Sequence, residues 1–403
     1  MDALAGLRVL ELGSTVAGPF CGRLLADFGA DVIKVESPSG DAVRAMGSHI
    51  GGKSLYAASI FRNKSLIAVD LSTREGQAVI KRLITRIDVL VENFRPGTLE
   101  KWGLGYDEMS RLNAGLIMVR ISGFGQDGPY RERPGYGFLG DAVSGLLSIT
   151  GFPDRPPVRA AVPVTDMLTG LYGAYGVTMA VLVRQRTGRG QCIDAALYES
   201  SFSMMECHVP AYGTLKLIPP RSGSRLPGST PNNLYPTKDG KTIAIAAASD
   251  AVFARLAAAM DNSDLARDSR FSEALCRTKN EDAIDEVISS WTRSLDLDDI
   301  EARLHKAEVP ASRVFTLEDI FSDQHYRERN MIVSMPDKDI GSVPMVGPVP
   351  RLSDTPGNIK WPGRHIGEDT EKILTQLGGF SASEISALEA SGAIRCDRTM
   401  RSE

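Results

Sequence analysis

An acidic side chain at the start of a long apolar stretch is the first feature of the chain that could do chemistry. Asp166 follows Pro163 and precedes a stretch rich in small residues, so the sequence predicts a helix over about 166–186. The positive end of the helix dipole keeps a carboxylate in the first turn ionised. An ionised carboxylate can attack a thioester carbonyl. A carboxylate that only caps the helix is the simpler alternative on spacing alone.

The turn at Gly13–Pro19 could bind phosphate, because it joins an apolar run to a helix whose first N–H groups point outward. A dinucleotide-binding fingerprint would need three glycines, and only Gly13 and Gly18 are present. Glu36 ends the next apolar run, where dinucleotide enzymes hold a ribose with an acid. A plain tight turn and a solvated glutamate are the simpler interpretation of these residues.

The loop Asn93–Gly97 brings an amide, an aromatic ring and a guanidinium to the end of another apolar run. An adenine could stack on Phe94, and phosphates could pair with Arg95, Lys101 or Arg74. A turn with a half-buried phenylalanine and a solvent-facing arginine is the alternative.

Strands that alternate with helices must position these groups. We expect the strands at Arg8–Leu12, Asp31–Glu36, Leu66–Asp70, Val89–Glu92, Leu116–Ser122 and Ile193–Ala195. Helices are expected over Pro19–Phe28, 75–85 and 166–186. This alternation predicts an α/β fold with a doubly wound parallel sheet, which is Rossmann-like and binds ligands beyond the carboxyl ends of its strands.

The 403 residues exceed one average core, so about two domains are expected. We predict a large α/β domain over 1–220, a smaller α+β domain over 225–325, and a return of residues 326–403 to the large domain. The small domain should contain a strand at Thr242–Ala246 and helices near 250–260, 281–294 and 297–306. Residues 327–394 are expected to be extended before two short helices, and the polar tail 395–403 is expected to fray.

Composition excludes several classes of protein. The chain has 46 basic and 50 acidic residues, and no basic block points to nucleic acid or an anionic membrane. Its N-terminus lacks a signal-peptide core, and no apolar run of about 18 residues is evident. The five cysteines form no C-x-x-C pair and the five histidines have no metal-ligand spacing. We therefore expect a cytoplasmic protein without a bound metal.

Taken together and in order, the motifs resemble the family III coenzyme A transferases, which include formyl-CoA transferase and carnitine CoA-transferase. They are also similar to those of the related α-methylacyl-CoA racemases. The resemblance covers almost the whole chain. The motifs that carry it are LAGLRVLEL at 4–12, VAGP at 16–19, FGADVIKVE at 28–36, RNKSL at 62–66, VENFRPG at 91–97, SGFGQDGP at 122–129, DMLTG at 166–170 and TGRGQ at 187–191.

The resemblance implies that Asp166 is the nucleophile and forms an aspartyl-CoA thioester, with no permanently bound cofactor. It implies that backbone amides of Val16, Ala17 and Gly18 stabilise oxyanions. The remaining residues implied in CoA binding are Leu71, Arg74, Asn93, Phe94, Arg95 and Lys101. Family members form homodimers whose chains are threaded through each other, so an interlocked homodimer is expected here.

Differences from the family motifs limit which substrates and which reaction type are expected. Formyl-CoA transferase carries glutamine where this chain has Val16, and a tetraglycine loop where this chain has Ser222–Gly228. Both departures disfavour formyl-CoA chemistry, and we expect succinyl-CoA as donor with a small dicarboxylic or hydroxy acid as acceptor. The racemases carry a histidine in a G-H-D motif where this chain has Tyr136. Without it, two-sided proton transfer at Cα loses a partner.

Three alternatives remain open at the level of sequence. They are a 2-methylacyl-CoA racemase, an NAD-dependent oxidoreductase and a CoA-binding protein without catalysis. The missing histidine argues against the racemase, and the incomplete glycine fingerprint argues against the oxidoreductase. The retained Asp166 argues against a protein that only binds CoA. A second substrate carboxylate could meet one of several loop arginines, namely Arg44, Arg155, Arg159 and Arg225.

Overall fold

The computed structural model describes residues 1–398, and residues 399–403 lie outside the described part. The chain divides into two compact units. The first contains residues 1–146, 160–215 and the chain from residue 325 onward, and the second contains residues 147–159 and 216–324. The sequence-based division differs at 147–159, which it assigns to the large domain. This segment groups with the second unit because the Gly223 N–H donates to the Gly151 carbonyl (2.9 Å) and Arg221 donates to the Phe152 carbonyl (3.0 Å).

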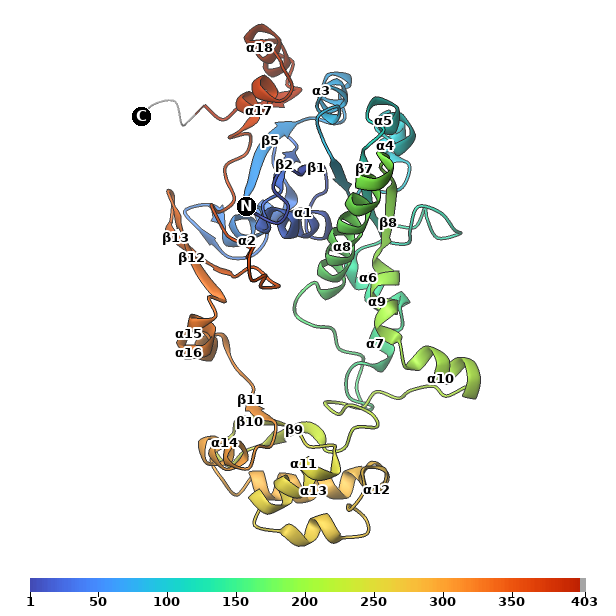
Figure 1. Cartoon of the computed structure of the whole chain (residues 1–403), viewed down its shortest axis with the longest axis vertical. Helices are drawn as coiled ribbons and strands as arrows, with labels where there is room; N and C mark the ends of the chain where they lie inside the picture. The colour runs from blue at the N-terminus through green and yellow to red at the C-terminus, as the bar shows by residue number, and fades with distance from the viewer. Residues whose placement is uncertain (399–403) are drawn as a thin grey trace. The chain divides into compact units, whose positions relative to one another are not determined.

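The first unit is built on a seven-stranded sheet with the order β14-β5-β2-β1-β6-β7-β8 (Figure 1). All neighbouring strands are parallel except β14 and β5. The six strands expected in this unit are confirmed, with ends that shift by at most two residues. The bounds are β1 Arg8–Glu11, β2 Asp31–Glu36, β5 Lys64–Val69, β6 Val89–Glu92, β7 Ile117–Ser122, β8 Cys192–Ala196 and β14 Ile394–Arg395.

The strand β14 corrects the expectation of a frayed tail from residue 395. Ile394 pairs with Val69 and Arg395 with Ala68, at the edge of the sheet. The apolar Ile394 is buried there, which favours pairing over fraying. The rest of that expectation, for residues 399–403, falls outside the described residues.

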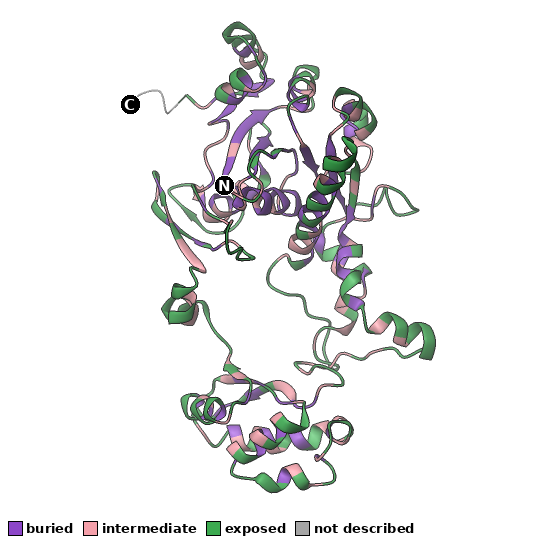
Figure 2. Ribbon diagram, in the orientation of Figure 1, coloured by how far each residue is buried: buried purple, intermediate pink, exposed green. Residues whose placement is uncertain are grey.

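Helices cover both faces of this sheet, which confirms the doubly wound α/β fold. One face carries α3 (Arg74–Ile84), α5 (Tyr106–Leu112), α17 (Thr370–Gln376) and α18 (Ala382–Ala390), and the other carries α1 (Ala17–Asp27) and α8 (Val164–Thr187). Successive strand residues go to opposite faces: Val9 packs with the α1 side and Leu10 with the α3 side. Figure 2 shows the central strands as buried.

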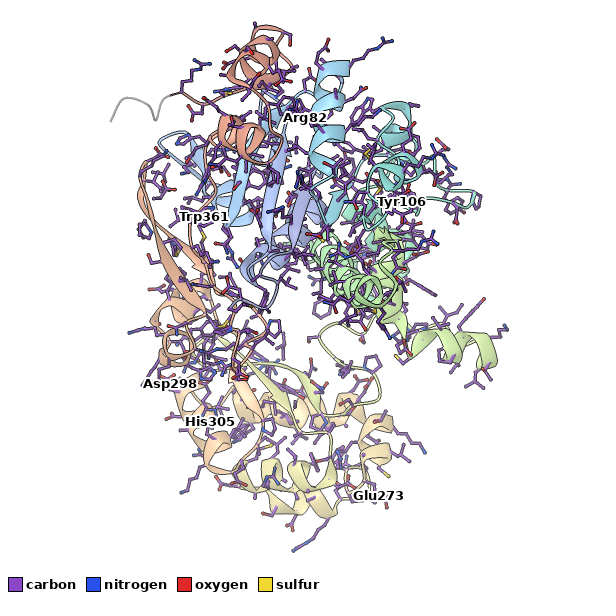
Figure 3. The ribbon with its side chains drawn as sticks, turned by 45° about the horizontal axis from the view of Figure 1, so that its top comes forward. Arg82, Tyr106, Glu273, Asp298, His305 and Trp361 are labelled. Atoms are coloured by element: carbon purple, nitrogen blue, oxygen red, sulfur yellow. The ribbon has the colours of Figure 1, made fainter. Side chains whose placement is uncertain are left out.

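The helix α3 shows how local sequence builds one of these layers. The Thr73 hydroxyl accepts a hydrogen bond from the Gly76 N–H (3.1 Å) and so caps the first turn. The buried residues are Gly76, Val79, Ile80, Leu83 and Ile84, which follow the helical period. On the exposed side, Arg82 donates to Glu384 of α18 (2.8 Å) and lies over the Phe380 ring (Figure 3).

The helix α8 packs along α1, and small residues allow the close approach. A Cβ atom at Gly170 would lie 2.7 Å from the Ala17 carbonyl oxygen. Among residues 1–398, α8 is long and apolar enough to cross a membrane by length and composition, which corrects the expectation of no such stretch. Its contacts with α1, β7 and β8 instead make it a core helix of the first unit.

Several short elements were not predicted, because a helix of one or two turns shows too little periodicity. They include an antiparallel hairpin, β12–β13, inside the segment expected to be extended. The two short helices expected after it are confirmed as α17 and α18. The further elements are α2 Leu55–Ile60, α4 Thr98–Lys101, α6 Gly137–Val143, α7 Leu146–Ile149, α9 Leu197–Phe202, α10 His208–Leu215, α16 Gln324–Glu328, β3 His49–Ile50, β4 Lys53–Ser54, β12 Ile332–Asp337, β13 Gly341–Val346, and 3-10 turns at Ala42–Ala45 and Ser203–Met205.

The second unit has its own antiparallel sheet and its own core. The sheet order is β11-β10-β9, with β10 at Thr242–Ala246 as predicted. The buried hydroxyl of Tyr235 donates to Asp285 (2.5 Å) beneath this sheet. The elements are β9 Asn232–Pro236, β11 Ala311–Arg313, α11 Asp250–Ala259, α12 Ala274–Lys279, α13 Glu281–Thr292, α14 Leu297–Lys306, α15 Leu317–Ser322 and a 3-10 turn at Ser263–Arg267.

Candidate active site

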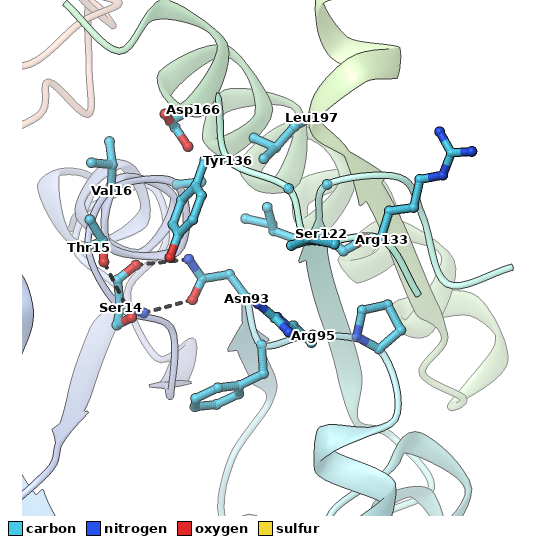
Figure 4. A pocket seen from close by; sticks show the side chains of 17 residues that line it. Ser14, Thr15, Val16, Asn93, Arg95, Ser122, Arg133, Tyr136, Asp166 and Leu197 are labelled. Atoms are coloured by element: carbon cyan, nitrogen blue, oxygen red, sulfur yellow. Dashed lines mark hydrogen bonds between the residues drawn. The ribbon is translucent and has the colours of Figure 1, made fainter. Parts of the chain in front are cut away.

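The site lies where the strand order reverses. From β1 the chain continues outward to β2 and β5 on one side, whereas β6, β7 and β8 follow on the other. Loops after the two central strands diverge at such a point and leave a crevice. The loop after β1 meets the loop after β6 there. The Ser14 N–H donates to the Asn93 side-chain oxygen (2.7 Å), and the Asn93 amide donates back to the Ser14 carbonyl (2.8 Å) (Figure 4).

A cavity of about 220 Å³ opens between these loops. All its lining residues belong to the first unit. They are Ser14–Ala17, Asn93–Pro96, Ile121–Gly123, Arg133–Tyr136, Asp166 and Leu197. The cavity therefore brings Asp166 together with Val16 and Ala17 of the first loop and with Asn93, Phe94 and Arg95 of the second.

Asp166 is the third residue of α8 and is half-buried. The preceding residue, Thr165, anchors this first turn because its buried hydroxyl donates to Asp141 of α6 and contacts the Ser201 hydroxyl of α9 (2.5 Å). The dipole of a 24-residue helix favours the ionised carboxylate at this end. The Tyr136 side chain, 74% exposed, stands beside Asp166 at the cavity (Figure 4).

Gly137 sets the place of the Asp166 carboxylate. A Cβ atom at Gly137 would lie 2.1 Å from Oδ2 of Asp166, far inside the closest possible contact. Any side chain at position 137 would therefore displace the carboxylate. Sequence reasoning noted Gly137 only as the end of the segment that replaces the racemase G-H-D motif and gave it no role in the site.

Tyr56 of α2 is a second group that sequence reasoning missed. Its hydroxyl is buried and has no hydrogen-bond partner among the described residues. Burial, followed by the negative charge of Asp166, raises the pKa of Tyr56 above its ordinary value, and Arg23 opposes this shift. No motif in the sequence links Tyr56 to Asp166, because 110 positions separate them along the chain.

A second hollow of about 310 Å³ adjoins the first and shares Phe94 and Ser14 with it. Leu71 and Trp102 also line it, and the rings of Phe94 and Trp102 meet edge to face at 5.2 Å. This hollow offers the apolar and aromatic surface that a nucleoside would need.

Three residues implied in binding line neither cavity. Gly18 instead packs against Gly13, where an added Cβ atom would lie 3.0 Å from the Gly13 Cα atom. Arg74 begins α3 and Lys101 ends α4, and both are exposed.

Two of the arginines proposed to bind a second substrate carboxylate are already paired with acidic side chains of the protein. Arg44 binds the Glu36 carboxylate with Nε (2.7 Å) and Nη2 (2.6 Å), so the two charges neutralise each other. Glu36 is buried, so the simpler interpretation of Glu36 as a solvated glutamate is wrong. Arg225, in the second unit, pairs with Asp285 (2.7 Å) and Asp282 (2.8 Å).

Arg155 and Arg159 are exposed and line neither cavity described above. Arg133, which sequence reasoning missed, lines the Asp166 cavity with its guanidinium pointing away, over the Tyr130 ring (Figure 4). Its position in the loop after the 122–129 motif is the signal that could have indicated it.

Comparison with known proteins places the chain among enzymes. The family model described as CoA-transferase family III matches residues 4–370. A succinyl-CoA–D-citramalate CoA-transferase of Chloroflexus aurantiacus is 44% identical over 97% of this chain and 98% of its own. The beta subunit of a succinyl-CoA–L-malate CoA-transferase of the same organism is 42% identical over 97% of this chain and 98% of its own.

A solved structure supports the same assignment. The crystal structure of a CAIB/BAIF family protein from Brucella suis superposes with a TM-score of 0.83 at 34% identity, covering 93% of this chain and 99% of the other. The match extends through both units, so the likeness is not confined to the seven-stranded sheet. The resemblance seen in the motifs is thereby confirmed, and the chain belongs to the CoA-transferase family III.

Proposed function

We propose that this enzyme transfers coenzyme A from succinyl-CoA to a small dicarboxylic acid through a thioester on Asp166. The observation that carries the proposal is the position of the Asp166 carboxylate, at a helix N-terminus in a cavity formed by the loops after β1 and β6. The relatives named above act on succinyl-CoA with citramalate or malate, which are dicarboxylic hydroxy acids. Their names support both the donor and the class of acceptor.

The proposed reaction has four steps in which bonds and charges balance. The Asp166 carboxylate attacks the donor thioester carbonyl, the C–S bond breaks, and an acyl-aspartyl anhydride forms with free CoA thiolate. The thiolate then attacks the Asp166 carbonyl, which gives the aspartyl-CoA thioester and releases succinate. The acceptor carboxylate attacks the carbonyl of this thioester, the C–S bond breaks, and a second anhydride forms with release of the CoA thiolate. The thiolate finally attacks the acceptor acyl carbonyl and regenerates the Asp166 carboxylate.

Each step passes through a tetrahedral oxyanion that needs hydrogen-bond donors. The start of α1 provides candidates, because Val16 caps this helix without a side-chain hydrogen bond to its first amides. Val16 and Ala17 line the same cavity as Asp166, and Gly18 follows them in the first turn. The proposed oxyanion donors are therefore the backbone amides of Val16–Gly18.

The CoA moiety is proposed to extend from Asp166 past Asn93 into the second hollow. Phe94 and Leu71 would contact the adenosine end, since they present apolar surface there. Arg95 lies in the same loop and would pair with a phosphate, as would Arg74 and Lys101 at the exposed starts and ends of their helices. No permanently bound cofactor has a role in this reaction scheme.

We further propose a cytoplasmic homodimer with interlocked chains. The helix α8 supports an interface, since Leu171, Tyr175, Met179 and Leu182 recur on one face and are 45–58% exposed. α10 has no buried residue at all. Apolar surfaces of this kind are usually covered by another chain.

The proposal is tested with purified enzyme and a panel of acyl-CoA donors and free acids, with the CoA esters read by mass spectrometry. We expect transfer from succinyl-CoA to citramalate, malate or a similar dicarboxylic acid, and little transfer to monocarboxylic acids of the same length. Transfer only among monocarboxylic or long-chain acids would overturn the substrate assignment.

A further inference from the structure

A buried lysine contacts the loop that follows β1, residues 13–16. Lys34 of β2 is 1% exposed, and its ammonium group donates to the carbonyl oxygens of Gly13 and Val35, the latter at 3.1 Å. It also forms an ion pair with Asp41 at 2.9 Å. A buried ammonium group is costly unless it is paired and hydrogen-bonded.

Asp41 continues this contact to the next residues of the loop. Its Oδ1 atom accepts hydrogen bonds from the Thr15 N–H (3.1 Å) and the Val43 N–H (2.9 Å). Thr15 has φ of +68°, a left-handed conformation that a β-branched residue adopts only under constraint. The carboxylate of Asp41 thus holds the loop at its most strained residue.

Asn93 holds the same loop through the two hydrogen bonds to Ser14. The peptide groups of residues 13–15 are therefore fixed by Lys34, Asp41 and Asn93. The amides proposed to bind the oxyanion follow immediately, at Val16–Gly18. A shift of the loop would move these amides relative to Asp166.

A neighbouring buried pair shows that ion pairing in this region need not involve the loop. Lys64 donates to Glu11 (2.7 Å) and to the Pro19 carbonyl (2.7 Å), which lies inside α1. Lys34 also forms an ion pair with Glu11 (3.9 Å), so the two pairs adjoin, but only Lys34 and Asp41 are hydrogen-bonded to residues 13 and 15. This difference in hydrogen bonding separates a role in the stability of α1 from a role in the geometry of the loop.

We propose that Lys34 and Asp41 are positioning residues, which hold the loop 13–16 so that its amides face the acyl group bound to Asp166. The inference rests on the proposed function for its catalytic consequence. Both side chains also border the second hollow, where CoA is proposed to bind, but their charged groups are bonded to each other and to the loop at Gly13 and Thr15. Both act through the backbone of Gly13 and Thr15.

The test uses Lys34→Met and Asp41→Ala in the full-length enzyme. We expect kcat to fall about 10-fold to 100-fold, because misplaced donors stabilise the transition state poorly. The KM for the acyl-CoA should change less than kcat. The double variant Lys34→Met with Asp41→Asn serves if a single variant does not fold, because it leaves no unpaired buried charge and keeps an oxygen acceptor for Thr15.

Asp27→Asn is the matched control. Asp27 forms an equally buried ion pair with Arg62 (2.6 Å), but this pair contacts the C-terminal chain at Val346 and not the loop. We expect this variant to lose thermal stability while the kcat of the folded enzyme stays close to that of the wild type. Equal losses of kcat in the control and in the Lys34 and Asp41 variants would show a general effect on stability and would overturn the inference.

Hydrogen–deuterium exchange of the peptide covering residues 13–20 gives a readout that does not depend on activity. Exchange should accelerate in Lys34→Met and Asp41→Ala and stay unchanged in Asp27→Asn. Unchanged exchange in the first two variants would reject the positioning role. If the wild-type enzyme transfers no CoA, the proposed function fails, while the exchange experiment still decides whether the pair holds the loop.

Discussion

Two constraints meet at Asp166: the helix dipole favours its charge, and Gly137 leaves room for its carboxylate. Replacement by alanine removes the nucleophile, and replacement by asparagine leaves a poor one. We expect both variants to fold, to bind CoA and to lose CoA transfer by roughly a thousandfold or more. Hydroxylamine should trap the acyl group of the wild-type enzyme and not of the variants. Substantial transfer by purified Asp166→Ala would exclude the nucleophile assignment.

Gly137→Ala tests the space next to that carboxylate. The new methyl group would lie 2.1 Å from Oδ2 of Asp166, so the Asp166 side chain must rotate or shift. A displacement of this size should lower kcat by about 100-fold with a smaller effect on stability. Gly115→Ala is the control, because its Cβ atom would meet the nearest neighbour at an ordinary 3.5 Å. Wild-type turnover in Gly137→Ala would mean that the carboxylate acts from another position.

Tyr136 is the single residue that argues against a racemase reaction, because it stands where the racemases carry a histidine. No histidine is among the described residues that line the Asp166 cavity, and a tyrosine hydroxyl is a poor substitute for an imidazole base. The wild-type enzyme should therefore not exchange the Cα proton of a 2-methylacyl-CoA at a useful rate. Incubation in deuterated water followed by mass spectrometry measures this exchange. Rapid incorporation of label at Cα would favour the racemase reaction.

At the scale of elements, the contact between α1 and α8 joins the two halves of the site. α1 provides the proposed oxyanion donors and α8 provides Asp166. Their backbones approach closely because Gly170 has no side chain. The distance between the nucleophile and the donors therefore depends in part on the packing contact at Gly170.

Gly170→Ala should push the helices apart and destabilise the fold by about 1–3 kcal/mol. We expect a lower melting temperature together with a lower kcat, because Asp166 lies one turn away on α8. Gly176→Ala is the control on the same helix: a Cβ atom there would meet only side-chain atoms of Ile193, the nearest at 3.0 Å, whereas one at Gly170 would meet the backbone of Ala17 at 2.7 Å. Equal effects of the two substitutions on kcat would contradict a special role for the Gly170 contact.

At the scale of the whole molecule, the exposed apolar faces of α8 and α10 predict a stable assembly. An interlocked interface would exceed a standard protein–protein interface and would not separate without unfolding. We therefore expect a homodimer with no folded monomer at nanomolar concentration. Analytical ultracentrifugation over a concentration series measures this. A stable and active monomer would rule out interlocking.

The sequence by itself determined the strands and helices whose apolar residues form a clear run or repeat. Runs such as Asp31–Glu36, Val89–Glu92 and Thr242–Ala246 match the observed strands because buried strands need contiguous apolar residues. It also indicated Asp166 and the loops Gly13–Pro19 and Asn93–Gly97, since chemistry at strand ends requires particular residue types. These signals are local, and a single sequence displays them.

Only the tertiary structure decided which distant groups meet. The pairing of Glu36 with Arg44, the space that Gly137 leaves for Asp166, and the hold of Lys34 on the loop all depend on contacts between separate elements. The same holds for the β14 strand, which pairs across more than 300 positions. Such contacts arise from packing in three dimensions, which the order of residues along one chain does not display.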